Sequence, residues 1–171
     1  MEARKSDDLL KRNFTAEKPL SKCLTDITEI KAKNGRPYVS AIFDCYDLTA
    51  IGLAMDENMK AELCAATVEN AAAAYPDFDG AVFHSDRGSQ YTSELYRCSL
   101  NEFNVRQSMN SADGRCHDNA RCESMWARMK NELFYSRGRR STDYTTEQLK
   151  TMIWRYYMSY WNNRRICSAI G

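Results

Sequence analysis

The chain has 171 residues, of which 43% are hydrophobic and 27% are charged, a composition typical of a globular domain with one core. No run of about 18 apolar residues is present, and no apolar stretch follows the polar N-terminus, so neither a membrane span nor a signal peptide is expected. Seven cysteines without a Cys-x-x-Cys pair indicate reduced thiols in a cytosolic protein rather than a disulfide framework.

The net charge of +1 conceals an uneven distribution along the chain. Residues 1–83 contain 10 Lys and Arg against 14 Asp and Glu, whereas residues 84–171 contain 14 against 9, so the two halves carry −4 and +5. The basic half is suited to receive a polyanion, although an imbalance of this size is also common on ordinary protein surfaces.

The first half of the chain predicts an antiparallel meander followed by a helix. Residues 1–22 are mostly polar and charged and are expected to form an arm or linker. Three runs of strand-type residues follow, at 23–30, 38–44 and 48–55. An Asn-Gly turn signal lies between the first two runs. Residues 60–75 are rich in Ala and lack Gly, which favours a helix that ends before Pro76.

The second half predicts two further strands and three helices. The expected elements are a strand that leads from 81–83 into Asp86, a helix at 92–103 capped by Thr92 or Ser93, a strand at 105–109, a loop at 110–117, a helix at 118–133 capped by Asp118, and a helix at 146–162. This order matches the ribonuclease H-like fold, an α/β fold with a mixed five-stranded sheet flanked by helices. In that fold the first and fourth strands lie side by side.

Three acids in these elements could hold metal ions. Asp26 lies in the middle of the first strand, and Asp86 lies at the carboxyl end of the fourth, where α/β sheets commonly place their chemistry. Glu123 lies in the first turns of a predicted helix. Two hard divalent ions held by carboxylates can activate a nucleophile and stabilise a leaving oxygen at a phosphodiester, and Mg²⁺ fits oxygen ligands better than Zn²⁺ does.

Each of these acids also has a structural explanation. Asp86 could start a turn, and Glu123 could simply complement the positive end of its helix. An acid inside an apolar strand, as at Asp26, favours a functional role because burial of an unpaired charge is costly. Asp44 competes with Asp26 as a ligand, but its position is more typical of a turn at the end of a strand.

Basic residues surround the last of the three acids. Lys130 follows Glu123 by seven residues, two helical turns, and therefore shares its face; it could hold a phosphate or remain a solvated surface lysine. The residues predicted to contact DNA are Lys130, Arg87, Arg121, Arg128 and Arg137. A different metal site, formed by Cys116, His117 and Cys122, is conceivable but lacks a fourth ligand.

Five short motifs occur together in this sequence: Leu24-Thr25-Asp26-Ile27-Thr28, the run from Phe83 to Ser93, Gln107-Ser108-Met109, Asp118-Asn119-Ala120 with Glu123, and the run from Tyr160 to Arg165. In combination they resemble the integrase-type catalytic core of bacterial insertion-sequence transposases. The nearest group is the insertion-sequence three family, whose transposase spans two overlapping reading frames. The resemblance extends from about residue 23 to the last residue.

This resemblance implies a D-D-E site at Asp26, Asp86 and Glu123 that binds two Mg²⁺ ions, for which Mn²⁺ can substitute, with Lys130 at the basic position after the glutamate. It implies an enzyme of the bacterial cytosol that cleaves and joins double-stranded DNA at transposon ends, acts as a homo-oligomer and needs no membrane. Two alternatives remain open: a plain metal-dependent nuclease of the same fold, such as a ribonuclease H or junction resolvase, and an inactive remnant that binds DNA or a partner.

Members of this family carry helix-turn-helix DNA-binding segments upstream of the core. Here only the polar stretch at 1–22 precedes the predicted core at 23–171. The chain is therefore expected to be a catalytic core without the segments that recognise the transposon ends.

Overall fold

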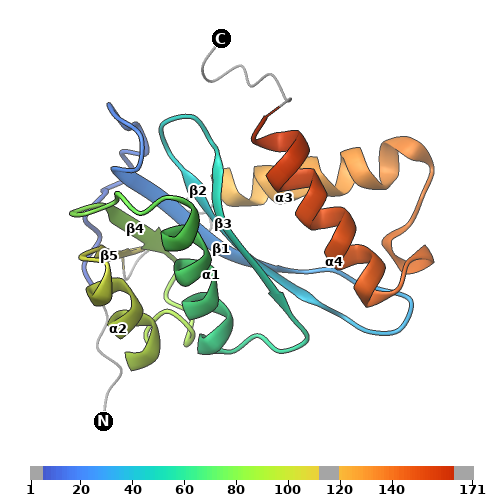
Figure 1. The fold of residues 1–171 in the computed structure, drawn as a ribbon, viewed down its shortest axis with the longest axis horizontal. Coiled ribbons are helices and arrows are strands. Elements are labelled where there is room, and N and C mark those ends of the chain that lie inside the picture. The colour runs from blue at the N-terminus through green and yellow to red at the C-terminus, as the bar shows by residue number, and fades with distance from the viewer. Residues whose placement is uncertain (1–5, 112–119, 164–171) are drawn as a thin grey trace.

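The computed structural model describes residues 6–111 and 120–163, which form a five-stranded sheet with helices on both faces (Figure 1). The elements are β1 (Lys22–Glu29), β2 (Tyr38–Asp44), β3 (Ala50–Asp56), α1 (Ala61–Ala74), β4 (Val82–Ser85), α2 (Glu94–Glu102), β5 (Arg106–Met109), α3 (Ala120–Leu133) and α4 (Thr146–Arg155). Short 3₁₀ turns at Tyr135–Arg137 and Ser141–Asp143 connect α3 to α4.

All the predicted strands and helices are present, with ends shifted by a few residues. Ser93 is the N-cap of α2, as expected, because its hydroxyl accepts a hydrogen bond from the Tyr96 N–H. The last predicted helix is only partly α-helical, since α4 continues as a π-helix at Tyr156–Trp161. The predicted cap Asp118 and most of the predicted 110–117 loop lie outside the described residues.

The strand order is β3-β2-β1-β4-β5. The first three strands form an antiparallel meander, and β4 and β5 run parallel to β1 and to each other. The predicted fold class is thereby confirmed, including the central placement of β1 beside β4. Figure 1 shows α1 and α2 close together at one side of the sheet and α3 crossing near α4 at the other.

Alternating residues of the central strands pack into two separate cores. On one face Cys23 and Ile42 belong to the cluster that includes α1 and α2. On the other face Leu24 and Phe43 belong to the cluster that includes α3 and α4. Because successive side chains of a strand point to opposite faces, the even-numbered residues of β1 from Leu24 onward face α3.

Gly52 of β3 lies directly against α1. A Cβ at this position would lie 2.7 Å from the Thr67 carbonyl oxygen and 2.9 Å from the Ala71 Cβ. The carbonyl is part of the helix backbone and cannot move alone, so only glycine allows this close approach of strand and helix.

We therefore expect Gly52→Ala to separate β3 from α1 and to lower the free energy of unfolding by about 1–3 kcal/mol, the usual cost of overpacking a core. Denaturant unfolding followed by circular dichroism measures the change. The control is Ala54→Ser, at a partly exposed position of the same strand, which is expected to change the free energy by less than about 0.5 kcal/mol. Equal stability of the Gly52 variant and wild type would contradict this account.

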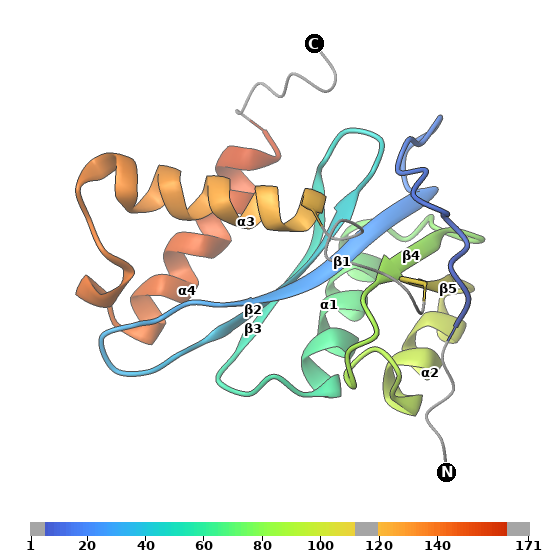
Figure 2. The same ribbon diagram turned by 180° about the vertical axis from the view of Figure 1, so that it is seen from behind.

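The segment before β1 packs along the edge of the sheet. In Figure 2 it runs past β5 and β4 towards the start of β1. The Leu9 N–H donates to the Ser108 hydroxyl (2.8 Å), and the Met109 N–H donates to the Asp7 carbonyl (3.1 Å). Leu10 is buried in the α3–α4 core. The division into an arm at 1–22 and a core at 23–171 remains a prediction.

None of the helices in the described part of the chain combines the length and the apolar character that a membrane crossing requires.

Candidate active site

Asp26 lies on β1, and Asp86 directly follows the last residue of the neighbouring strand β4. The parallel pairing of these two strands ends with Leu24 opposite His84, two residues before each acid. Asp26 belongs to the face of the sheet that α3 covers, because its carboxylate accepts a hydrogen bond from Trp126 of that helix. Both acids therefore follow the point at which the pairing of β1 and β4 ends.

A buried hydrogen bond joins Asp26 to α3. The Trp126 indole N–H donates to Oδ2 of Asp26 over 3.1 Å. The Trp126 ring is itself held edge-on by Phe43 and Tyr157, with ring centroids 5.5 and 6.0 Å away. Because Trp126 lies about one turn after Glu123, this bond ties the helix that carries the third acid to the strand that carries the first.

Asp86 begins a tight turn that includes Gly88. Its Oδ1 accepts the Gly88 N–H over 2.8 Å. A Cβ at Gly88 would lie 3.0 Å from that same oxygen. The structural explanation of Asp86 as a turn residue is therefore correct, and the same turn also orients its carboxylate.

Glu123 lies in the first turn of α3, and its side chain is exposed. The neighbouring Cys122 is buried, and burial raises the pKa of its thiol well above the ordinary value. The charges of Asp26, Cys45, Asp86 and Glu123 raise that pKa further.

Within residues 6–111 and 120–163, no three His, Cys, Asp or Glu side chains are close enough together to share a metal ion. The convergence of Asp26, Asp86 and Glu123 on an ion pair therefore stays a prediction. The donors that the sheet supplies are carboxylate oxygens, which suit Mg²⁺ or Mn²⁺ rather than Zn²⁺. Two residues of the alternative metal site, Cys116 and His117, lie outside the described residues.

Asp44, the competitor of Asp26, is a turn residue. Its two carboxylate oxygens accept the backbone N–H groups of Leu20 and Tyr46, each over 2.9 Å. Burial raises the pKa of Asp44, and these two hydrogen bonds oppose the shift. It pairs with Cys23, three residues before Asp26 on β1, and its carboxylate is occupied by the turn, as the sequence favoured.

Lys130 reaches back to the strand that carries Asp26. Its ammonium group lies 3.3 Å from the Thr28 hydroxyl, and Thr28 is two residues after Asp26 on the same face of β1. The side chain is partly buried rather than freely solvated. Its position places a positive charge on the same face of the sheet as the acids.

The predicted arginine contacts occupy different positions. Arg87 donates to the Asn110 carbonyl, and Arg137 donates to the Glu132 carbonyl. Arg121 donates to the Phe14 carbonyl. Arg128 is partly buried on α3. Three of the four guanidinium groups thus already bind backbone oxygens of this chain, and their contact with DNA stays a prediction.

Sequence reasoning did not assign Trp126, Cys122 or Phe14 to the site. Trp126 was recognised only as part of the apolar pattern of its helix, although a buried indole N–H requires an acceptor. Cys122 was considered only for a different metal site. All five cysteines among the described residues are free, as expected for reduced thiols.

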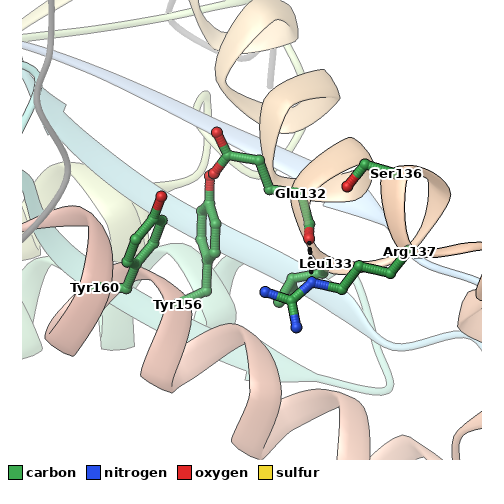
Figure 3. A pocket seen from close by; sticks show the side chains of 6 residues that line it. All are labelled: Glu132, Leu133, Ser136, Arg137, Tyr156 and Tyr160. Atoms are coloured by element: carbon green, nitrogen blue, oxygen red, sulfur yellow. Dashed lines mark hydrogen bonds between the residues drawn. The ribbon is translucent and has the colours of Figure 1, made fainter.

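A hollow of about 440 Å³ lies near the other end of α3 (Figure 3). It is lined by Glu132, Leu133, Ser136, Arg137, Tyr156 and Tyr160. The Tyr156 hydroxyl donates to the Glu132 carboxylate over 2.6 Å. Glu132 lies nine residues, roughly 13 Å of helix axis, beyond Glu123, so this hollow is separate from the carboxylates.

Two solved structures that share this fold come from retroviruses. A chain of a simian T-cell lymphotropic virus intasome in complex with a PP2A regulatory subunit superimposes with a TM-score of 0.66 and 13% identity, covering 98% of this chain and 56% of that one. The HTLV-2 integrase catalytic core domain in complex with magnesium gives a TM-score of 0.59 and 11% identity, covering 88% and 90%. The fold is therefore ribonuclease H-like, of the kind found in integrase catalytic cores.

The family follows from the sequence itself. The integrase core domain model matches residues 16–116, more than half of the chain, and the chain belongs to that family. An uncharacterized transposase-like protein of Haemophilus influenzae is 37% identical over 163 residues, which cover 94% of this chain and 71% of the relative.

Other curated relatives are named as insertion-sequence transposases. The InsF transposase of insertion sequence IS3A of Escherichia coli K12 is 34% identical over 76% of this chain and 45% of its own length. A probable IS1353 transposase of Shigella flexneri is 35% identical over 96% of this chain, which spans only 31% of that relative. The resemblance drawn from the five motifs is confirmed. The chain spans from about a third to about two thirds of these relatives.

Proposed function

We propose that this domain cleaves DNA at transposon ends and joins the cut strand to a target, with Asp26, Asp86 and Glu123 as metal ligands. The observation that carries the proposal is that Asp26 and Asp86 each lie two residues beyond the last paired residues of adjacent parallel strands, with α3 hydrogen-bonded to Asp26. The transposase relatives support DNA as the substrate. We further propose action as a homo-oligomer in the bacterial cytosol.

The carboxylates of this face would hold two Mg²⁺ ions, or Mn²⁺ in their place. Such ions, when bound, help to deprotonate the attacking oxygen and stabilise the leaving oxygen of the phosphodiester. The donor set fits, since hard divalent ions take carboxylate oxygens and keep much of their water. The HTLV-2 integrase core, a structural neighbour, is described in complex with magnesium.

The other residues of the site would orient these carboxylates and the DNA. The Trp126 N–H donates a hydrogen bond to Oδ2 of Asp26, and the Gly88 N–H donates one to Oδ1 of Asp86. Both carboxylates are therefore already oriented before ions bind. Lys130, beside Thr28, would contact a phosphate of the bound strand. In the joining step a 3′-hydroxyl oxygen forms a bond to a target phosphorus while the bond to the departing 3′ oxygen breaks, and the hydroxyl proton goes to water.

A strand-transfer assay tests this proposal. A fluorescent duplex with a free 3′-hydroxyl is incubated with supercoiled plasmid in Mg²⁺, and fluorescent plasmid reports joining. We expect joining with wild type, none in EDTA, and none with Asp86→Asn. Asp56→Asn is the matched control, because Asp56 also ends a strand and accepts a backbone N–H. Nicking without joining would indicate a plain nuclease, and metal-dependent DNA binding without either would indicate an inactive remnant.

A further inference from the structure

Phe14 lies between α3 and β4. Its carbonyl accepts a hydrogen bond from Nη1 of Arg121 over 3.2 Å, and the same guanidinium lies 5.7 Å from the centre of its ring. The ring also lies edge-on to the His84 ring, with centroids 5.8 Å apart, and packs against the core between the sheet and α3. Arg121 is two residues before Glu123, and His84 is two residues before Asp86. Phe14 therefore bridges the elements that carry two of the proposed ligands.

The His84 side of this bridge is rigid. The His84 ring is 3% exposed. Its two nitrogens lie 2.8 Å from the Ser108 hydroxyl and 2.7 Å from Oδ1 of Asn110. Asn110 also bonds through its backbone to Ser85 and to the Arg87 side chain, on either side of Asp86. The Phe14 ring therefore contacts the His84 ring, which hydrogen bonds hold in place close to Asp86.

The backbone around Phe14 is also held in place. The Lys22 ammonium group, at the start of β1, donates to the carbonyls of Asn13 and Thr15, the residues on either side of Phe14. Leu10 anchors the same segment in the core between the sheet and α3. Because these contacts restrain both the chain and the ring, Phe14 presents a fixed acceptor and a fixed aromatic face to Arg121.

The contacts of Arg121 hold the very start of α3. Further along the helix, Trp126 is buried and bonds to Asp26, and Lys130 bonds to Thr28. Arg121 lies five residues before Trp126, roughly 7.5 Å along the axis. Glu123 lies between Arg121 and Trp126, so the contacts of Arg121 with Phe14 restrain the exposed side of the turn that carries Glu123.

We infer that Phe14 is a positioning residue: through Arg121 it holds the first turn of α3, which carries Glu123, against the N-terminal segment and the His84 end of β4. The role of Glu123 in this statement rests on the proposed function, whereas the restraint on the helix does not. Arg121, predicted from sequence to contact DNA, here has the different task of joining the helix to the N-terminal segment. A cation above an aromatic ring at an exposed site is a weak contact, so it orients a turn without governing overall stability.

The test compares Phe14→Ala, Phe14→Tyr and the control Phe103→Ala. Phe103 is another partly buried phenylalanine in edge-on contact with an aromatic ring, but it packs beside α2. The first measurement is amide hydrogen exchange in metal-free protein. We expect Phe14→Ala to accelerate exchange at residues 123–126 with α4 unchanged, and Phe14→Tyr to restore the wild-type pattern.

The second measurement is Mn²⁺ binding by titration calorimetry, together with kcat and KM for joining. Phe14→Ala is expected to weaken Mn²⁺ binding by about tenfold, as for losses of residues that orient a ligand, and to lower kcat with little change in the KM for DNA. Phe103→Ala should do neither. Wild-type exchange at 123–126 and wild-type Mn²⁺ affinity in Phe14→Ala would overturn the inference. Absence of joining by a wild-type protein that shows the exchange difference would overturn the proposed function alone.

Discussion

Replacing Glu123 by Gln is expected to abolish joining while leaving the fold and DNA binding intact. Gln has the same size but offers a neutral oxygen in place of a carboxylate. Loss of residues that only orient ligands costs 10–100-fold, so loss of a ligand itself should reduce the rate by more than about a hundredfold. Because Glu123 is exposed, the free energy of unfolding should change by less than about 0.5 kcal/mol.

Glu147→Gln is the matched control for this experiment. Glu147, like Glu123, is an exposed glutamate in the first turn of a helix, and its change to Gln should leave joining at the wild-type rate. Rates come from the plasmid assay in Mg²⁺, affinity from fluorescence anisotropy of a labelled duplex, and stability from denaturant unfolding. Wild-type turnover by the Glu123 variant would remove Glu123 from the ligand set.

The second large effect is expected at Trp126. Two variants separate the contribution of its ring to core packing from the contribution of its N–H to the orientation of the Asp26 carboxylate. Trp126→Ala removes a buried ring that contacts Phe43 and Tyr157, and should cost about 3–5 kcal/mol of unfolding free energy. Trp126→Phe keeps an aromatic ring but removes the N–H donor to Asp26. It should cost about 1–3 kcal/mol, the usual penalty when a buried acceptor loses a hydrogen-bond donor.

Trp126→Phe should also lower the joining rate, by about 10–100-fold, because the Asp26 carboxylate loses a group that orients it. The assay is run at a temperature where the variant is fully folded, as judged by its own unfolding curve. Trp154→Phe is the control, since Trp154 is 52% exposed on α4. A folded Trp126→Phe protein with wild-type joining would mean that the hydrogen bond contributes to stability only.

Much of the fold was predictable because each element carries a local signal. The apolar run at 38–44 is the strand β2 with the same ends, and the Ala-rich stretch became α1. Thr92 and Ser93 are both typical cap residues, and in the structure it is the Ser93 hydroxyl that accepts the Tyr96 N–H. These signals depend on residues within one or two turns of each other. The π-helical end of the last helix had no such signal, because its hydrogen bonds depend on how Tyr156 and Trp161 pack in the core.

The sequence by itself also determined which acids to examine, since Asp26 stands inside an apolar strand and Asp86 ends another. Only the tertiary structure decided what touches them. The pairing of β1 with β4 joins residues 60 positions apart, and the contacts from Trp126 to Asp26 and from Arg121 to Phe14 span 100 and 107 positions. Periodicity reports which face of an element is buried, because burial depends on the average environment of a side chain. A hydrogen bond depends on one partner atom at one distance, and that distance is set by strand pairing and helix packing across the whole chain.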